Sequence, residues 1–151
     1  MRLTYQRYYN ISGEDMTTVL KTMKLHIHVS EEEEFLLKDL TTKYSEACNA
    51  LSEYLFQHDF PMNFMVLQNA MYQTIRDMYG LKSQMTISAC KTVTARYKTI
   101  QEQLYKKPYK WKDEDDEWHY ETRTLKWLWK PVMFRRPQAD LVRNRDYSFV
   151  T

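Results

Sequence analysis

The spacing of apolar residues predicts one half-buried strand near the start of the chain. Apolar side chains at every second position from Met23 to Val29 alternate with lysine and histidine. This period of two is expected of a strand with one face on a core. Residues 1–15 show no clear period and are interpreted as an N-terminal extension. The first β-strand is therefore predicted within residues 16–29.

A long amphipathic helix is predicted directly after this strand. Ser30 is followed three residues later by Glu33, the spacing of a capping box, in which each residue accepts a hydrogen bond from the backbone N–H of the other. Apolar residues then recur at intervals of three and four up to Gln57. They are Phe35, Leu36, Leu40, Tyr44, Ala47, Cys48, Leu51 and Tyr54. The first helix is predicted over residues 31–57.

Two further helices follow, separated by a single glycine-containing break. Asn63 is the predicted N-cap of the second helix, and Gly80 is its predicted left-handed terminator. Ser83 opens the third helix, which continues to Leu104. The predicted buried residues of the second helix are Leu67, Ala70, Met71, Ile75 and Met78. Those of the third are Met85, Ala89, Val93, Tyr97, Ile100 and Leu104.

The C-terminal part has a different pattern. Residues 113–121 are predicted to form an acidic loop, and residues 122–130 alternate Leu and Trp with other side chains, which predicts a second strand. Two short strands are predicted within residues 139–150. The order indicates an α+β fold, in which helices over residues 30–112 are inserted into a β-structure built from both ends of the chain.

Charge is distributed unevenly along this chain of 151 residues with a net charge of +2. Residues 10–62 carry 4 basic and 10 acidic residues, whereas residues 82–112 carry 8 basic residues and one acidic. Residues 122–145 carry 7 basic residues and one acidic. Lysines and arginines clustered in this way are typical of phosphate binding, although two solvated basic faces would give the same count. Lys91 and Lys98, two helical turns or about 10.5 Å apart, could follow one phosphate backbone.

No pattern predicts a catalytic, cofactor or metal site. His26 and His28 lack a cysteine or carboxylate at a suitable spacing and are interpreted as surface or phosphate-contacting residues. The run Asp113–Glu117 could hold a divalent ion but is expected to be solvated. Cys48 lies on a predicted apolar stripe, so its thiol is expected to stay protonated and not to act with His119 as a nucleophile and base. The alternating tryptophans after residue 125 are interpreted as core rather than base-stacking side chains.

The cysteine content and hydropathy predict the cellular environment. Cys48 and Cys90 stand alone within helical patterns, which favours reduced, buried thiols in a cytoplasmic protein. The sequence contains neither a signal-peptide pattern nor an apolar run of the roughly 18 residues that a membrane span requires. The chain is therefore expected to be soluble and to have no membrane partner.

Three segments, in order, resemble the N-terminal region of TnpB (OrfB) proteins, the transposon-encoded RNA-guided nucleases related to type V CRISPR effectors. They are "MKLHIHVSEEEEFLLKDLTTKYSEACNALSEYL", "GLKSQMTISACKTVTARYKT" and "KPVMFRR … VRNRDYSF". Ala47 and Asn49 stand where the family has an "ACRxxYNxxL" type of stretch. The family's "LPSQxxQxAxxxxxxAYK" type of stretch is matched at Leu81, Ser83, Gln84, Ala89, Tyr97 and Lys98.

The resemblance implies a fold and a set of partners. It implies a small wedge-like β-barrel, formed by residues 16–29 and 122–151, with a three-helix bundle inserted as a recognition domain. It also implies structured guide RNA as a partner, together with duplex DNA next to the target. The candidate nucleic-acid contacts are Asn63, Lys82, Ser83, Gln84, Lys91, Lys98, Lys106, Lys107, Lys126, Lys130, Arg135, Arg136, Arg143 and Arg145.

The chain departs from the family pattern at several positions. Lys82 replaces a common proline, and Arg96 replaces the alanine before Tyr97. Ile87 stands where the family often has a glutamine thought to read the target-adjacent DNA motif, and its side chain has no hydrogen-bonding group. The chain ends before any RuvC-like domain or zinc element, so it is expected not to cut DNA by itself.

Three functions fit this sequence. The first is a nucleic-acid-binding module without nuclease activity. The second is a truncated or split RNA-guided endonuclease that needs a separate RuvC-bearing chain. The third is a protein-interaction or repressor role for a remnant of a transposon protein. The first predicts binding that weakens steeply with salt.

Overall fold

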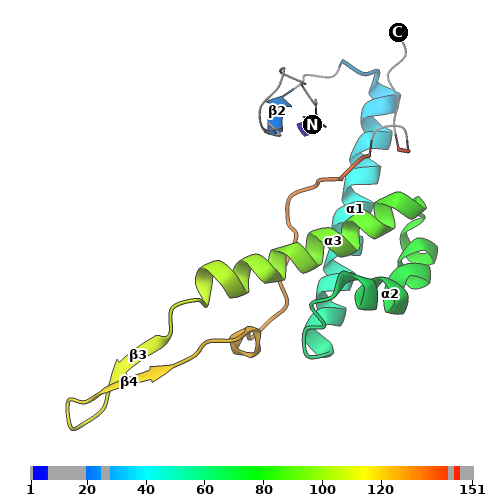
Figure 1. Ribbon diagram of the computed structural model, residues 1–151. Helices are drawn as coiled ribbons and strands as arrows, with labels where there is room; N and C mark the ends of the chain where they lie inside the picture. Colours follow the sequence, from blue (N-terminus) through cyan, green and yellow to red (C-terminus); the bar gives the residue numbers. More distant parts are fainter. Residues whose placement is uncertain (1, 7–19, 25–27, 143–144, 147–151) are drawn as a thin grey trace, which may run out of the picture. The chain divides into compact units, whose positions relative to one another are not determined.

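The computed structural model describes residues 2–6, 20–24, 28–142 and 145–146 (Figure 1). The chain divides into two compact units, Met1–Leu36 and Leu37–Thr151. Its described residues form three long helices and two separate two-stranded sheets. This mixture of helix and strand agrees with the predicted α+β class.

The first unit contains an antiparallel pair of strands. β1 (Arg2–Gln6) pairs with β2 (Leu20–Lys24), with Leu3 opposite Met23. β2 lies within the predicted strand, but β1 lies in the segment interpreted as an extension, and that interpretation is wrong for residues 2–6. The pairing with β2 supplies the backbone hydrogen bonds of β1, and such long-range pairing leaves little periodic signal in five residues.

Helix α1 (Glu31–Gln57) begins and ends where the sequence predicts. The Ser30 N–H donates to Glu33 Oε2 at 2.8 Å, and the Glu33 N–H donates to Ser30 Oγ at 3.3 Å. The predicted capping box is therefore confirmed. Hydrogen bonds from the Ser30 backbone and hydroxyl also lower the pKa of the Glu33 carboxyl.

The second and third helices also have the predicted boundaries at the break between them. Helix α2 (Phe64–Tyr79) ends at Gly80, whose φ of 63° is left-handed and whose N–H donates to the Arg76 carbonyl at 2.9 Å. Helix α3 (Ser83–Thr99) continues as a π-helical turn, η1 (Ile100–Leu104). The predicted third helix thus keeps its length but changes its hydrogen-bonding pattern over the last five residues.

The three helices share one core within the second unit. Its fully buried side chains include Tyr44, Leu51, Leu55, Leu67, Ile75, Met85, Val93 and Tyr97. Several residues predicted to be buried are instead exposed: Phe35, Leu36, Ala70, Met78 and Leu104. The core begins near Leu40, so the apolar residues in the first turns of α1 precede it. The helical period identifies which face of the helix is apolar. It does not show over what length that face is covered by other helices.

A hairpin follows η1 and extends beyond the end of α3 (Figure 1). Strand β3 (Tyr109–Lys112) pairs antiparallel with β4 (Trp118–Glu121). The acidic loop is therefore shorter than predicted, since only Asp113–Glu117 forms the turn. The helical segment is shorter as well, because residues 109–112 are a strand. Cross-strand pairing, which depends on residues 6 to 12 positions apart, accounts for both differences.

The strand predicted over residues 122–130 is wrong. Residues Leu125–Trp127 form a 3₁₀ turn, η2, and the following residues are extended without a sheet partner in the described part of the chain. Leu125 and Leu128 point into or towards the core at a spacing of three, whereas Trp129 is 81% exposed. The described residues of 139–150 likewise contain no strand, and residues 143–144 and 147–150 lie outside the described structure.

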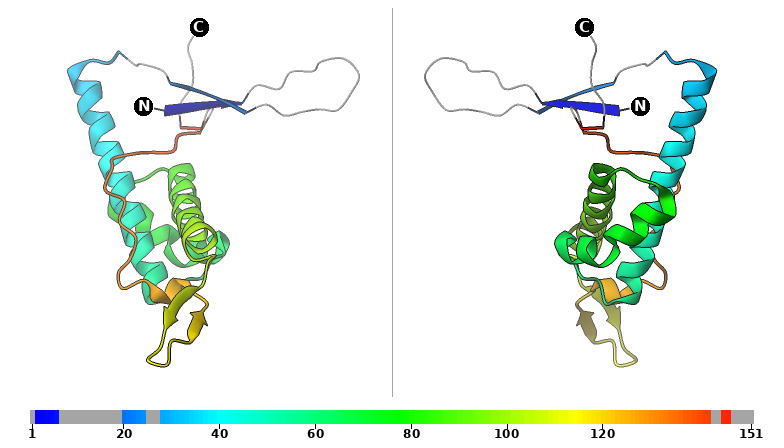
Figure 2. Two further views of the ribbon diagram at one scale, coloured as in Figure 1. Left: turned by 90° about the vertical axis from the view of Figure 1, so that its left-hand side faces the viewer. Right: turned by 90° about the vertical axis from the view of Figure 1, so that its right-hand side faces the viewer.

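The chain then returns as an extended segment, residues 131–140, which we call the strap. It runs alongside α1 in both views of Figure 2. Its partly buried side chains, Val132, Phe134 and Ala139, pack against the helical core. The strap is thus part of the second unit although it has no regular secondary structure.

Candidate nucleic-acid interface

The outer face of α3 carries two of the predicted contact residues. Lys91 and Lys98 are exposed, and the opposite side of the helix contributes Val93 and Tyr97 to the core. The Lys91 ammonium lies 5.2 Å from the centre of the Phe64 ring, at the start of α2. The exposure of this basic face confirms the prediction made from the helical period.

Two neighbouring residues of α3 differ from their expected placement. Thr94, which the helical period places on the same side of α3 as Lys91 and Lys98, is buried and donates its hydroxyl to the Cys90 carbonyl at 3.0 Å. Arg96, which the same period places near the apolar stripe of α3, is exposed. The basic surface of α3 therefore extends further round the helix than Lys91 and Lys98 alone.

The N-terminal end of α3 holds a second group of predicted contacts. Lys82 and Ser83 are exposed, and Lys82 occupies the N-cap position without a side-chain hydrogen bond to the helix. Gln84 accepts a hydrogen bond from Arg145 Nη1 at 2.7 Å. This contact brings Arg145 to the start of α3. Ile87, which cannot hydrogen-bond to a base, is half-buried.

Asn63 has a structural role that limits its use as a contact. Its side-chain oxygen accepts the N–H of Met65 at 3.0 Å and caps α2, as the sequence predicts. This bond uses one of the two lone pairs of the oxygen and fixes the orientation of the amide group. Asn63 is thus a weaker candidate for base readout than the exposed residues at the start of α3.

Arg135 and Arg136 are exposed on the strap, and polar residues of α1 fix the strap beneath them. Asn49 accepts the Phe134 N–H at 2.7 Å and donates to the Phe134 carbonyl at 3.4 Å. Ser45 donates to the Arg136 carbonyl at 3.2 Å and accepts the Gln138 N–H at 3.3 Å. These bonds replace the sheet partner that the strap lacks.

A second pair of anchors joins the strap to α1 and α3 together. Ser52 donates to the Val132 carbonyl at 2.7 Å, and the Val132 N–H donates to the Tyr97 hydroxyl at 3.1 Å. Further along, Asp140 accepts hydrogen bonds from Thr92 at 2.7 Å and from Tyr44 at 3.2 Å. The position of Arg135 and Arg136 along the chain is therefore set by side chains far away in the sequence.

Sequence reasoning did not assign these anchors. The sequence indicates Asn49 only as a match to a family stretch, and it predicts no role for Ser45 or Ser52. A usable signal was present, because Ser45, Asn49 and Ser52 are polar residues at helical spacing within an otherwise apolar face. A polar row of this kind on a buried helix face indicates that backbone polar groups of another segment lie against it.

The base of the hairpin adds further cations with different surroundings. Lys106 and Lys107 are exposed. Arg123 donates to the carbonyls of Lys107 at 3.0 Å and Leu104 at 2.6 Å, which ties the two ends of the hairpin together. Lys126 is ion-paired with Asp59 at 3.1 Å, so a phosphate there would have to compete with a carboxylate.

All four tryptophans are exposed, including the two after residue 125 that the sequence predicts to be core. Trp111, Trp118, Trp127 and Trp129 are exposed by 37%, 57%, 40% and 81%. The Lys130 ammonium lies 4.1 Å from the centre of the Trp129 ring. The interpretation of the alternating tryptophans as core is therefore wrong, because residues 122–130 form a 3₁₀ turn and a loop instead of a strand.

The buried thiols agree with their predicted inert state. Cys48 and Cys90 are both free and buried. Burial raises the pKa of Cys48 to about 12 and that of Cys90 to about 11. Both thiols stay protonated at neutral pH, so neither is an activated nucleophile.

The acidic turn of the hairpin is ordered by its own hydrogen bonds. Asp113 Oδ1 accepts the N–H groups of Asp115 and Glu117 at 3.1 and 2.9 Å, while Asp113 Oδ2 lies 2.5 Å from His119 Nε2. The His119 contact, followed by the backbone bond from Glu117, lowers the pKa of the Asp113 carboxyl. Among the described residues, no group of three His, Cys, Asp or Glu side chains could hold a metal ion.

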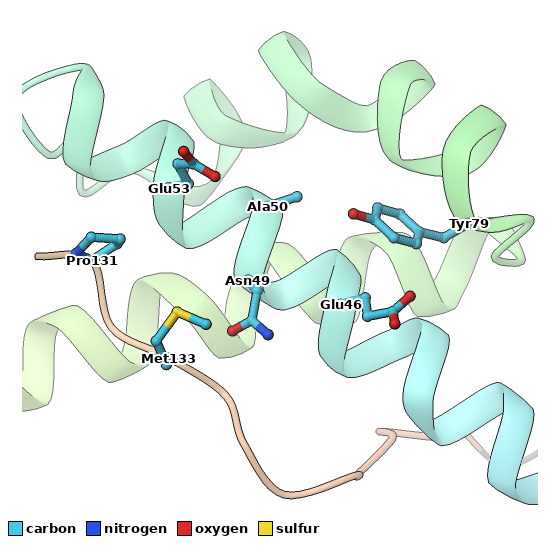
Figure 3. Close-up of a pocket in the computed structure, with 7 residues that line it drawn as sticks. All are labelled: Glu46, Asn49, Ala50, Glu53, Tyr79, Pro131 and Met133. Atoms are coloured by element: carbon cyan, nitrogen blue, oxygen red, sulfur yellow. The ribbon is translucent and has the colours of Figure 1, made fainter.

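An acidic hollow of about 290 Å³ lies between α1 and the strap (Figure 3). Its lining residues are Glu46, Asn49, Ala50, Glu53, Tyr79, Pro131 and Met133. Burial, and then the nearby charges of Glu46 and Glu53, raise the pKa of the Tyr79 hydroxyl. The carboxylates of Glu46 and Glu53 would repel a polyanion from this hollow.

The remaining cations form an unpaired set. After residue 81, the exposed lysines and arginines without an ion-pair partner in the described structure are Lys82, Lys91, Arg96, Lys98, Lys106, Lys107, Lys110, Lys130, Arg135, Arg136 and Arg145. They are carried by α3, the hairpin and the chain from residue 130 onward. Arg143, also predicted as a contact, lies outside the described residues.

No helix within the described ranges is long and apolar enough to cross a membrane. Comparison of the chain with protein-family models, curated proteins and solved structures gives no match.

Proposed function

We propose that this protein binds structured RNA, and duplex DNA beside it, through the unpaired cations of its second unit. The observation that carries the proposal is that the exposed cations after residue 81 mostly lack carboxylate partners. Cations already matched to carboxylates contribute little to phosphate binding, whereas unpaired ones release counterions from a nucleic acid. In this proposal the chain binds and does not cut.

The likeness to the N-terminal region of TnpB proteins stays part of the proposal. It rests on sequence patterns at Ala47, Asn49 and the stretch Leu81–Lys98. This resemblance implies two structural parts, a wedge-like barrel and a three-helix recognition bundle. The shared core of α1, α2 and α3 supports the second part. For the first part, β2 is a strand but pairs with β1, and the described residues after 121 contribute no strand to a barrel.

The experiment measures binding of a labelled RNA hairpin of about 16 base pairs, the span of a double-stranded RNA-binding surface. Fluorescence anisotropy is recorded over a series of salt concentrations for the full chain. The wild-type affinity is expected to fall steeply with salt. The double variants Lys91→Gln/Lys98→Gln and Arg135→Gln/Arg136→Gln are each expected to reduce the logarithmic salt slope by about 2, one per lost phosphate contact.

A matched control removes the same charge elsewhere. Lys43 is ion-paired with Asp39, and Arg76 lies over the Tyr72 ring on α2. The variant Lys43→Gln/Arg76→Gln is expected to leave the salt slope unchanged. Equal loss of affinity in the control and in both test variants would show a general charge effect and contradict the proposed surface. Salt-independent binding would contradict the function itself.

A further inference from the structure

The β3–β4 hairpin presents two chemically different faces. In an antiparallel pair, directly opposite residues point to the same side of the sheet. Tyr109 lies opposite Glu121 and Trp111 opposite His119, which places these four on one face. Lys110 opposite Tyr120, and Lys112 opposite Trp118, form the other, which we call the lysine–aromatic face.

The rings of the first face are occupied by one another. Trp111 stacks on Tyr109 at 5.6 Å and on His119 at 5.4 Å, measured between ring centres. Tyr109 also contacts Trp127 at 5.6 Å. This row of contacts holds the hairpin together and joins it to the chain that leaves it. A ligand would have to separate these rings before it could stack on them.

The lysine–aromatic face has open rings instead. Trp118 and Tyr120 are 57% and 59% exposed. The Lys110 ammonium lies 5.0 Å from the centre of the Tyr120 ring, and the Lys112 ammonium lies 5.4 Å from that of Trp118. An ammonium group covers only a small part of a ring. Two aromatic surfaces and two cations therefore lie together on a solvent-facing patch.

We propose that the lysine–aromatic face binds unpaired nucleotides of a single-stranded nucleic acid. One base stacks on Trp118 and the next on Tyr120, while Lys110, which has no ion-pair partner in the described structure, contacts the connecting phosphate. Rings two residues apart on a strand are separated by about 6.8 Å, which leaves room for a base on each. Stacking platforms combined with a basic surface are the general means of binding single strands.

The charges at the two ends of the hairpin determine the path of the bound nucleic-acid strand. Neither strand contributes a carboxylate to the lysine–aromatic face, because Glu121 is on the other side. Lys106 and Lys107 continue the positive charge at the open end of the hairpin. At the closed end, Asp113–Glu117 repels phosphates, and Asp116 already pairs with Lys112 at 2.5 Å. The bound strand leads from Trp118 past Tyr120 towards Lys106 and Lys107 and avoids the turn.

This inference rests on the proposed function only in taking nucleic acid as the ligand, since it uses residues outside the α3 and strap surfaces. The test is anisotropy of a labelled oligouridylate of about eight nucleotides, at low salt, with the full chain. Trp118→Leu is expected to weaken binding at least about tenfold, and Trp118→Phe to retain most of it, because a ring is kept for stacking.

Two controls separate stacking from charge. Trp129→Leu removes a ring that is 81% exposed but lies outside the hairpin, and it is expected to leave the affinity unchanged. An oligonucleotide of the same length with abasic sites keeps its phosphates and is expected to bind wild type and Trp118→Leu equally. Far-UV circular dichroism checks that each variant is folded.

The outcomes separate this inference from the proposed function. Equal oligouridylate affinity of wild type and Trp118→Leu, or no binding by wild type, overturns the inference whatever the RNA hairpin does. Loss of oligouridylate binding in Trp118→Leu supports it, even if the RNA hairpin is bound without dependence on Lys91 and Lys98. Binding of proteins, but of no oligonucleotide, by the lysine–aromatic face would also overturn the inference.

Discussion

The strap and the β3–β4 hairpin are both exposed segments that follow α3, but they are held in different ways. The hairpin is regular, with a paired register and cross-strand ring contacts, and its strands contribute no fully buried side chain. The strap has no regular structure, yet Ser45, Asn49 and Ser52 hydrogen-bond its backbone. Regular secondary structure and attachment to the core are therefore separate properties.

The two segments differ because their backbone N–H and C=O groups have different hydrogen-bond partners. In the hairpin they pair with each other, so the segment needs little from the rest of the protein. In the strap they pair with side chains of α1 and α3, so the strap depends on the helices being folded. We expect substitutions at the strap and its entrance to act on global stability, and substitutions in the hairpin to act locally.

The largest expected effect is at the point where the chain leaves the hairpin. Leu125 is 6% exposed, whereas Leu104, at the entrance to the hairpin, is 60% exposed. Leu125→Ala leaves a cavity and is expected to lower the free energy of unfolding by about 2–5 kcal/mol. Leu104→Ala removes the same atoms from a solvated position and should change it by less than about 0.5 kcal/mol. Urea unfolding followed by circular dichroism measures both.

Equal effects of the two leucine variants would contradict the placement of Leu125 in the core. A small effect of both would mean that the chain after the hairpin detaches without disturbing the helices. Either result would remove the distinction drawn between the hairpin and the segment that follows it.

An intermediate effect is expected at the strap itself. Asn49→Ala removes both hydrogen bonds to Phe134 and leaves the Phe134 backbone N–H and carbonyl unsatisfied. The free energy of unfolding, measured in urea, is expected to fall by about 1–3 kcal/mol. Asn69→Ala, at an exposed position within α2, has the same change in helix propensity without a lost bond. It should be neutral or slightly stabilising. Similar values for the two variants would show that the strap contributes nothing to stability.

The smallest expected effect is the change in hairpin structure at acidic pH. The pKa of Asp113 is lowered in the folded state, so its contribution to stability is present above its ordinary value of 3.8. That contribution is lost as the pH falls from 3.8 through the lower folded pKa. Near-ultraviolet circular dichroism of the hairpin aromatics should therefore change in this range, while the helical signal at 222 nm changes less.

Asp113→Asn supplies the control for the acid titration. The asparagine oxygen can still accept the backbone bonds from Asp115 and Glu117, but the ionic contact with His119 is gone. The variant should show a flatter near-ultraviolet response than wild type below pH 3.8. Identical curves would assign the response to other carboxyl groups and remove the role given to Asp113.

The helices could be predicted from the sequence because their signals are local. The capping box of Ser30 and Glu33, the cap at Asn63 and the left-handed Gly80 all act within a few residues. The exposure of Lys91 and Lys98 follows from the same short-range period. No comparable local signal revealed β1, or decided how far along α1 the core extends.

The sequence by itself thus determined the three helices, their ends, the inert buried thiols and the basic outer face of α3. Only the tertiary structure decided that residues 131–140 are a strap anchored by α1, and that the tryptophans are exposed. The hydrogen bonds that anchor the strap join residues 35 to 96 positions apart. Such contacts form only after the helices have packed, so local periodicity carries no record of them.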